Sequence, residues 1–476
     1  MRFIFVSFSQ SVFPEIVEVS NQLHRLGHRT VYWLGSSEPS SFIDESGKTG
    51  VVDDDFLLSL SNHVLLEAKD LVMLNEQEPF IFDFLHRMQP RHTLPQLERR
   101  YHLLFRYCKW LLEQMKPNVI VFRTTPNLPP VHFILYSLAR ARGIRTIIFC
   151  DTWVSQRVIA MTDFILGPSN LKKNTEDQSI ISPAKLAKDL QAYYNSQIRD
   201  VPQGVPAYMP HILQGYSFFN RGTAAFRAIR QAWRLRLLKK MWRTLASRVI
   251  FWFRHNLSNE LPRAYKKLSS KADFTKPFIY FPLHLQPEFS TNPLGGHFRN
   301  QLLALELLVA SLPSGWQIYV KEHPTQWLVG GARRTPYRPK DYYSIMARFP
   351  SVRLIPVDTD SFQLIRQAKA VATISGTAGW EAVLRGKPSL VFGYPWYQHA
   401  PGVSSVTDLA SCQTALARIA AGEVPDPQAV LRFLKHLDEV SFRGCLDLSY
   451  RTNSKYFTET PESQARGMLK IILGLL

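Results

Sequence analysis

Residues 371–393 read VATISGTAGWEAVLRGKPSLVFG. The apolar run at its start and the one at its end each predict a buried strand, and the residues between them favour a helix that stops at Gly386. The loop before this helix is Ser375-Gly376-Thr377. Two hydroxyls, a glycine that permits close backbone approach and the free N–H groups of a helix N-terminus suit a phosphate. An ordinary Ser/Thr turn with a helix cap is the alternative interpretation.

Glu381 lies one turn into the predicted helix. A carboxylate has the wrong charge to sit beside a phosphate, but it is suited to accept hydrogen bonds from ribose or base hydroxyls farther out. The 371–393 stretch therefore predicts the corner of an α/β sheet that binds a nucleotide.

The whole chain is long, globular in composition and strongly basic. Its 476 residues predict two domains or more, and 45% hydrophobic residues are enough for a core in each. Lys and Arg outnumber Asp and Glu by 57 − 38 = 19. Such a surplus favours polyanionic partners, which include anionic lipid, acidic glycans, nucleotides and nucleic acid.

Cysteine and hydropathy patterns exclude several classes of protein. The four cysteines are scattered, without a CxxC pair or a His at metal-ligand spacing, so we expect neither a disulfide framework nor a metal site. The apolar N-terminus reaches polar Ser9 too early for a signal peptide and is expected to be a buried strand. No apolar run is long enough to predict a membrane span.

The first third of the chain alternates strand and helix patterns. Strands are expected at 2–8, 30–34, 119–122 and 144–149, with helices at 16–26, 97–115 and 134–142 between them. Residues 36–95 have no clear pattern. In a doubly wound sheet, ligands bind beyond the strand ends. Asp151 is the carboxylate placed at such an end, where a catalytic role and a turn or cap role are both open.

The segment 201–259 contains no Asp or Glu, and ten Lys or Arg fall within 221–254. Apolar residues recur there every three or four positions, which predicts an amphipathic helix whose Trp-bearing face has basic flanks. Such a helix is typical of an anionic membrane interface, and a core-packing helix with a solvated basic side is the alternative. Nucleic-acid binding is not expected, because no reader motif accompanies the charge. The candidate interface residues are Arg227, Arg230, Trp233, Arg234, Lys240, Trp242 and Arg243.

Two further loops carry dense polar chemistry. A strand at 278–281 runs into PLHLQPEFS, which contains His284, Gln286 and Glu288. A strand at 316–320 ends in Lys321-Glu-His323-Pro. If these strands neighbour the one at 371–374, the three loops converge on one edge of the sheet, and His323 with Ser375 and Thr377 would hold a phosphate.

This constellation resembles a GT-B glycosyltransferase. More narrowly, FPLHLQPE, KEHP and SGTAGWEA resemble motifs of the bacterial capsule and surface-polysaccharide biosynthesis proteins that include the Kdo transferases. The resemblance is best over 276–396 and weaker around 117–157. It implies two facing Rossmann-like α/β domains, here with a basic amphipathic helical insertion or linker.

The resemblance also implies a donor site. Its Gln-Pro motif falls on Gln286 and Pro287, its His-Pro motif on Lys321, His323 and Pro324, and the Ser375 and Thr377 hydroxyls would meet the nucleotide phosphate. Together with His284, Gly376 and Glu381 these residues form the predicted nucleotide-sugar site. The typical donor is a CMP-activated ulosonic acid such as Kdo, and the acceptor a glycan or lipid-linked glycan of capsule or lipopolysaccharide.

The chemistry of such a transfer requires a stabilised phosphate leaving group and a deprotonated acceptor hydroxyl. Glu288 or Asp151 is the expected base, or the nucleophile if the reaction retains configuration. Neither a metal nor another cofactor is expected, because the groups of the predicted nucleotide-sugar site would neutralise the charge of the leaving phosphate. A UDP-sugar hexosyltransferase, a UDP-sugar 2-epimerase of the same fold and a non-catalytic glycan- or membrane-binding scaffold stay open as alternatives.

The expected organisation has four parts. Residues 1–170 form an acceptor domain, 171–274 the basic linker, 275–440 the nucleotide-sugar domain, and 441–476 a helical segment that crosses back to the first domain. We expect a cytoplasmic protein, peripheral on the inner face of the cytoplasmic membrane.

Overall fold

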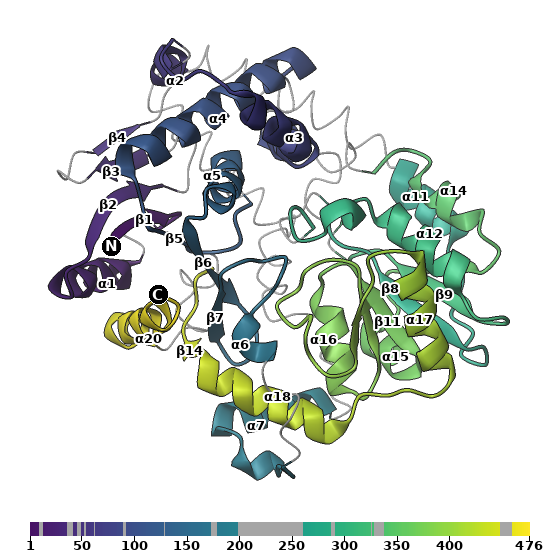
Figure 1. The fold of residues 1–476 in the computed structure, drawn as a ribbon. Coiled ribbons are helices and arrows are strands. Elements are labelled where there is room, and N and C mark those ends of the chain that lie inside the picture. The colour runs from purple at the N-terminus through teal and green to yellow at the C-terminus, as the bar shows by residue number, and fades with distance from the viewer. Residues whose placement is uncertain are drawn as a thin grey trace, which may run out of the picture.

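The chain folds around two separate β-sheets, each covered by helices (Figure 1). The computed structural model describes residues 1–8, 13–35, 41–44, 49–51, 54–60, 62–88, 92–127, 129–172, 179–198, 260–286, 291–324, 326–327, 338–447 and 459–476. The basic segment 221–254 and Glu288, both singled out in the sequence, lie outside these residues.

The first sheet has eight strands in the order β14-β7-β6-β5-β1-β2-β3-β4. Its four central strands, β6, β5, β1 and β2, are parallel to one another. On both sides, each strand farther out pairs antiparallel with its inner neighbour. The strands are β1 (Arg2–Val6), β2 (Arg29–Leu34), β3 (Ser41–Asp44), β4 (Thr49–Val51), β5 (Val119–Phe122), β6 (Arg145–Asp151), β7 (Arg157–Met161) and β14 (Phe442–Arg443).

Alternation along β1 explains how this sheet is covered on both faces. Phe3 and Phe5 point into an apolar cluster with α1 (Pro14–Arg25) and α20 (Pro461–Gly474). Ile4 and Val6 point into a second cluster on the opposite face, which includes α3 (Ala68–Met88), α4 (Leu94–Met115) and α5 (Pro130–Ala141). Because successive side chains of a strand face opposite ways, the continuous apolar run of β1 requires both layers.

The second sheet is wholly parallel, in the order β10-β9-β8-β11-β12-β13. From β8 the chain moves outward through β9 to β10, then returns to the other side of β8 for β11. The topological switch point therefore lies between β8 and β11. The strands are β8 (Phe278–Pro282), β9 (Gln317–Lys321), β10 (Val352–Ile355), β11 (Ala370–Thr373), β12 (Ser389–Val391) and β13 (Val403–Ser405).

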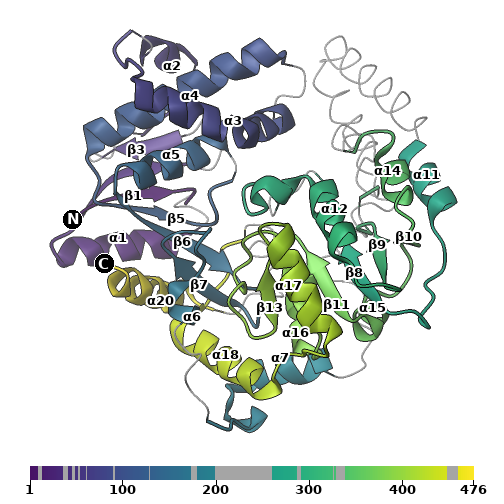
Figure 2. The ribbon, with the colours of Figure 1, turned by 45° about the vertical axis from the view of Figure 1, so that its right-hand side comes forward.

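Helices cover both faces of the second sheet (Figure 2). The apolar cluster with Ile279 and Phe281 of β8 includes α12, α14 and α17, and the cluster with Phe278 and Tyr280 includes α15 and α16. The helices are α11 (Glu260–Leu268), α12 (Gln301–Ser311), α14 (Tyr342–Ala347), α15 (Ser361–Gln367), α16 (Thr377–Leu384) and α17 (Leu409–Ala420). Both domains are Rossmann-like, so the α/β expectation of two such domains is confirmed.

The two domains are tied together by segments that leave one and pack on the other. Beyond β7, α6 (Ser169–Lys172) contacts α18 (Pro427–Val440), and α7 (Lys188–Ile198) contacts α16. In the reverse direction, α18 leads into β14, which pairs with β7, and α20 then packs against α1. Both chain termini accordingly lie at the first domain (Figure 1).

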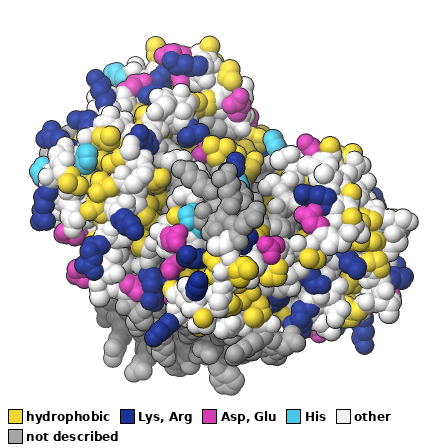
Figure 3. All heavy atoms as spheres, turned by 60° about the horizontal axis from the view of Figure 1, so that its bottom comes forward, with side chains coloured by type: hydrophobic (Ala, Val, Ile, Leu, Met, Phe, Trp, Pro, Cys, Tyr) yellow, Lys and Arg dark blue, Asp and Glu magenta, His cyan; other side chains and the backbone are white. Residues whose placement is uncertain are grey.

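On one face of the molecule, basic side chains are spread out rather than gathered at one place (Figure 3). On the face shown in Figure 3, Lys and Arg are interspersed with Asp and Glu. None of the helices in the described part of the chain has the length and apolar character needed to span a bilayer.

Candidate functional site

The loops that follow β9, β8 and β11 share one edge of the second sheet. Their strands are hydrogen-bonded neighbours, and all three run parallel. Residues that follow Pro282, Lys321 and Thr373 therefore emerge side by side, at and beside the switch point where α/β sheets bind ligands. The convergence that the sequence predicted for these loops is thus met by the sheet order.

His284 forms the bridge between two of these loops. Its Nε2 lies 3.1 Å from the Thr373 hydroxyl at the end of β11, and the Ser375 backbone N–H points to the same nitrogen at 3.4 Å. The Gly376 N–H donates to the Thr373 hydroxyl at 3.2 Å. His284 is buried, with 7% of its surface exposed. Through these hydrogen bonds, the buried His284 ring holds the Ser375-Gly376 loop in place.

Gly376 is closely packed in this turn. A Cβ atom at this position would lie 3.0 Å from the Thr373 hydroxyl and 3.1 Å from the His284 ring. The Tyr397 hydroxyl also donates to the Gly376 carbonyl, which pins the loop from the other side. The result is a rigid, glycine-tight turn that leads directly into the N-terminus of α16.

The first turn of α16 presents the polar groups that the sequence singled out. Thr377 is exposed at the helix start, and its hydroxyl interacts with the Glu381 carboxylate one turn along. Burial raises the pKa of the Glu381 carboxyl, against the opposing influence of the Arg385 guanidinium and the Thr377 hydroxyl. The free N–H groups and the positive end of the helix dipole favour an anion here.

Gln286 is held inside its own loop. Its backbone N–H donates to the Gln326 side-chain oxygen at 2.8 Å, and the Gln326 amide donates back to the Gln286 carbonyl at 2.9 Å. The Gln286 side chain donates to the Thr291 hydroxyl at 2.7 Å. The two hydrogen bonds between Gln286 and Gln326 link the loop after β8 to the loop after β9.

Beneath these loops lies a buried charged network centred on Glu322, which sequence reasoning did not single out. Its carboxylate accepts from the Arg338 guanidinium at 2.9 Å and from the Tyr343 hydroxyl at 2.5 Å. The Arg338 guanidinium also donates to the His284 carbonyl at 2.8 Å. Glu322 and Arg338 are 1% and 2% exposed. A Glu between a Lys and a His is unremarkable in sequence, and its partner Arg338 is 16 residues away, so only tertiary contact identifies the pair.

Lys321 and His323 flank Glu322 but differ in their surroundings. The Lys321 ammonium donates to the Thr359 carbonyl at 2.5 Å and the Ser361 hydroxyl at 2.7 Å, both beyond the end of β10. Burial lowers the pKa of Lys321 to about 8. His323 is half-buried, and its backbone N–H donates to the Glu322 carboxylate at 2.7 Å. Lys321 thus links the end of β9 to the loop after β10.

Asp151 stands at the end of β6 on the first sheet. Its carboxylate accepts from the backbone N–H of Leu446 at 3.0 Å, in the segment that returns from the second domain. Arg123, at the end of β5, donates to the carbonyls of Ser7 and Leu446. Asp151 therefore has a structural task in holding the crossing segment, whatever else it does.

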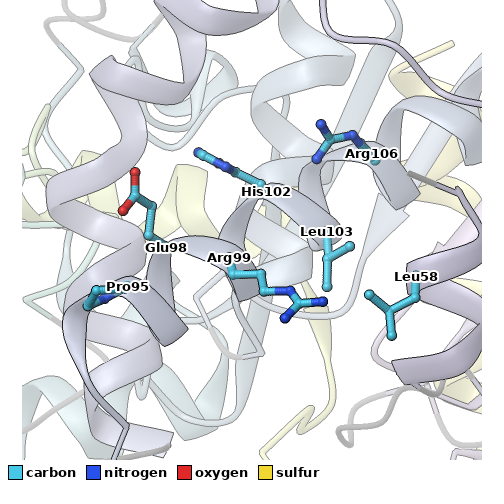
Figure 4. Close-up of a pocket in the computed structure, with 7 residues that line it drawn as sticks. All are labelled: Leu58, Pro95, Glu98, Arg99, His102, Leu103 and Arg106. Carbon is cyan, nitrogen blue, oxygen red and sulfur yellow. The ribbon is translucent and has the colours of Figure 1, made fainter. Parts of the chain in front are cut away.

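A surface depression lies elsewhere, between α2 (Asp54–Leu60) and α4 (Figure 4). It is a shallow groove of about 310 Å³. Leu58 and Leu103 lie along it, with Arg99, His102 and Arg106 presented by one face of α4. It lies on the helical layer of the first domain and shares no residue with the switch-point loops. In the described residues, no group of three or more His, Cys, Asp or Glu could hold a metal ion.

Comparison with known proteins finds one protein family that part of this chain resembles. Residues 263–445 match the family model of capsule polysaccharide biosynthesis proteins. The match covers this part of the chain. It runs from α11 through the whole second sheet to β14, and so contains all three switch-point loops. The resemblance to the capsule biosynthesis glycosyltransferases, which the sequence placed over 276–396, is confirmed for this capsule-family region.

Solved structures similar to the chain include three enzymes. Thermosulfurimonas dismutans KpsC, a beta Kdo 2,7 transferase, is 14% identical, with a TM-score of 0.30 over 82% of this chain and 95% of that one. Methanocaldococcus jannaschii UDP-GlcNAc 2-epimerase is 9% identical, with a TM-score of 0.26 over 92% and 100%. The spinosyn rhamnosyltransferase SpnG is 10% identical, with a TM-score of 0.27 over 95% and 100%. A search of curated protein sequences found no match. With every TM-score below 0.5, the assignment rests on the capsule-family match.

Proposed function

We propose that the protein is a glycosyltransferase of bacterial surface-polysaccharide synthesis that transfers a CMP-activated ulosonic acid, such as Kdo, to a glycan or glycolipid. The observation that carries this proposal is the switch-point corner, where His284, Ser375 and Gly376 are joined at the N-terminus of α16. A nucleotide phosphate fits at this corner because its charge meets the N–H groups of the first turn of α16 and the positive end of the helix dipole. The capsule-family match supplies the pathway class.

In the proposed reaction, the bond between the sugar's anomeric carbon and the donor phosphate oxygen breaks, and the electron pair leaves with CMP. The N–H groups at the start of α16, the exposed Thr377 hydroxyl and His323 stabilise the departing phosphate. The Glu381 carboxylate accepts hydrogen bonds from the hydroxyls of the nucleoside. With these groups in place, we propose that no metal or other cofactor is needed.

The acceptor oxygen then forms the new bond to the anomeric carbon and loses its proton to a carboxylate. We propose Glu288 or Asp151 for this step, from the second and the first domain respectively. As the base, Asp151 would act while its carboxylate also accepts the hydrogen bond from the Leu446 N–H. The variants Glu288→Gln and Asp151→Asn distinguish the two candidates. Substitution of the true base is expected to abolish transfer while CMP still binds.

The proposal is tested by calorimetric binding of CMP, UDP, GDP and ADP to the unaltered protein and to His323→Ala. We expect selective CMP binding that His323→Ala weakens by about tenfold or more, because loss of one hydrogen bond to a charged group costs roughly 1.5–3 kcal/mol. Selective UDP binding would instead support a hexosyltransferase or a 2-epimerase. CMP binding without consumption of CMP-Kdo would support a binding scaffold, and binding of none of the four nucleotides would reject the site.

We also propose that the protein is peripheral on the inner face of the cytoplasmic membrane, through residues that lie outside the described ranges. The absence of acidic residues from 201–259 supports this proposal. Neutralising Arg227, Arg230, Arg234, Lys240 and Arg243 together is expected to abolish co-sedimentation with phosphatidylglycerol-containing vesicles. A variant that neutralises five exposed basic residues of the second domain is the charge-matched control. Unchanged sedimentation of the first variant would reject the interface.

A further inference from the structure

The turn between β6 and β7 has an unusual backbone. Trp153, Ser155 and Gln156 all have positive φ angles, of 61°, 44° and 57°. These are three of the five non-glycine residues with positive φ in the described chain. Side chains with a Cβ pay about 1–3 kcal/mol to adopt such a conformation, and strained residues cluster at ligand sites. The turn therefore holds a shape that its sequence does not favour locally.

Surrounding contacts fix this turn on both sides of Trp153. The Thr152 hydroxyl accepts from the Val154 N–H at 3.2 Å and donates to the Arg157 carbonyl at 2.8 Å. The Ser155 hydroxyl donates to the Asp189 carbonyl on α7 at 3.1 Å. Thr152 and Val154 are 1% and 0% exposed. The buried neighbours leave Trp153 turned outward, with 46% of its surface exposed.

The position of this tryptophan relates it to the proposed reaction. It lies two residues after Asp151, at the same edge of the first sheet as Ser7 and Arg123. Its neighbour Val154 belongs to an apolar cluster that also contains Trp380 of α16 and Tyr397. Tyr397 in turn donates to the Gly376 carbonyl in the donor corner. The β6–β7 turn thus connects the edge of the first sheet to the donor corner of the second.

We propose that the Trp153 indole is the platform on which the acceptor's terminal sugar ring stacks. The inference rests on the proposed function. A saccharide is the ligand class that fits, because the C–H face of a pyranose packs on an aromatic ring while its hydroxyls require polar neighbours such as Asp151. The pinned backbone lets the indole bind with little loss of conformational freedom. Trp153 thereby selects and orients the acceptor, and leaves donor binding to the second domain.

The test separates acceptor from donor. With CMP-Kdo as donor, Trp153→Ala is expected to raise the acceptor KM about tenfold or more, while CMP affinity and the slow hydrolysis of donor by water stay within twofold. Trp153→Phe is expected to keep most of the acceptor affinity. Phe274→Ala removes another exposed aromatic ring, 37% exposed and before β8, and serves as the matched control. An unchanged acceptor KM in Trp153→Ala would overturn the inference and leave the proposed function intact.

A binding experiment decides the matter even if no transfer is seen. Saturation-transfer NMR is carried out with methyl glycosides of Kdo, glucose, galactose and N-acetylglucosamine, with and without CMP. We expect ring-proton signals from at least one glycoside, kept in Trp153→Phe and Phe274→Ala and reduced by more than half in Trp153→Ala. No signal from any glycoside, or equal signals in Trp153→Ala, would overturn the platform. Failure of CMP to bind in the same samples would count against the donor site alone.

Discussion

At the scale of single residues, the switch-point corner proposed to bind the donor is closely packed. Gly376 faces the Thr373 hydroxyl and the His284 ring at distances that a methyl group cannot share without displacement. Lys321 keeps a charge in a buried place by donating to Thr359 and Ser361. Both residues were predicted as nucleotide-sugar ligands, which stays a prediction, and the contacts described here are structural.

We expect Gly376→Ala to weaken CMP binding by about tenfold or more, because the added methyl forces the Ser375 loop away from His284. Isothermal titration calorimetry measures the loss. Gly474→Ala is the control, since no atom lies within 4 Å of its added Cβ. Equal CMP affinity in Gly376→Ala and the unaltered protein would show that the loop's shape does not matter for the nucleotide.

Lys321 predicts a dependence of stability on pH. Its pKa is about 8 in the folded protein against 10.5 as the ordinary value, because burial disfavours the ammonium. Between these values the unfolded chain binds more protons, so the free energy of unfolding rises with pH, and this contribution is lost as pH falls through 8. We expect a rise of about 2 kcal/mol from pH 8 to 10. Urea denaturation at each pH measures it, and a slope that persists in Lys321→Met would assign it to another group.

At the scale of elements, the end of β9 is held by the buried pair of Glu322 and Arg338. This pair joins the loop after β9 to α14 through Tyr343, and to the loop after β8 through the His284 carbonyl. Desolvation, followed by the negative charge of Glu322, raises the pKa of the Tyr343 hydroxyl, which therefore stays a hydrogen-bond donor. Three elements thus share one charged centre beneath the proposed phosphate site.

We expect Arg338→Met to destabilise the protein by about 3–5 kcal/mol, because it leaves Glu322 charged, buried and without its guanidinium partner. Adding Glu322→Gln is expected to recover part of this loss, since the amide carries no charge. Chemical denaturation of the single and double variants measures both. A single variant as stable as the unaltered protein, or a double variant less stable than the single, would contradict this account.

At the scale of the whole molecule, the C-terminal segment binds the two domains into one protein. After α18 the chain adds β14 to the first sheet and lays α20 on α1, where Ala465, Met468 and Ile472 are buried. A buried Arg157 on β7 is bonded to Asp189 of α7 and to Asp438 of α18. The sheet of the first domain is therefore completed by residues more than 280 positions away.

We expect Met468→Ala to lower the free energy of unfolding by about 2–5 kcal/mol, through lost burial and the cavity left between α20 and the first sheet. Lys470→Ala on the exposed side of the same helix is expected to change it by less than about 0.5 kcal/mol. Thermal and urea denaturation compare the two. Equal effects would mean that α20 does not contribute to the core of the first domain.

The sequence by itself determined the alternation of strand and helix, because apolar periodicity and Gly stops at positions such as Gly386 are local signals. It also determined the polar loops after β8, β9 and β11, since those residues follow their strands directly. It did not determine β3, β4, α2 and α3 within 36–95. There, mixed patterns and Pro79 inside α3 are overridden by packing on α4 and α5.

Only the tertiary structure decided how the pieces combine. Strand order placed β8 between β9 and β11, which brought His284 onto the Ser375 loop 91 residues away. It paired Glu322 with Arg338, bound Asp151 to the returning chain at Leu446, and turned Trp153 outward on a strained turn. These outcomes depend on contacts between residues far apart in the chain. A local pattern can predict a strand and its polar end, but the neighbours of that end are set by the packing of the whole molecule.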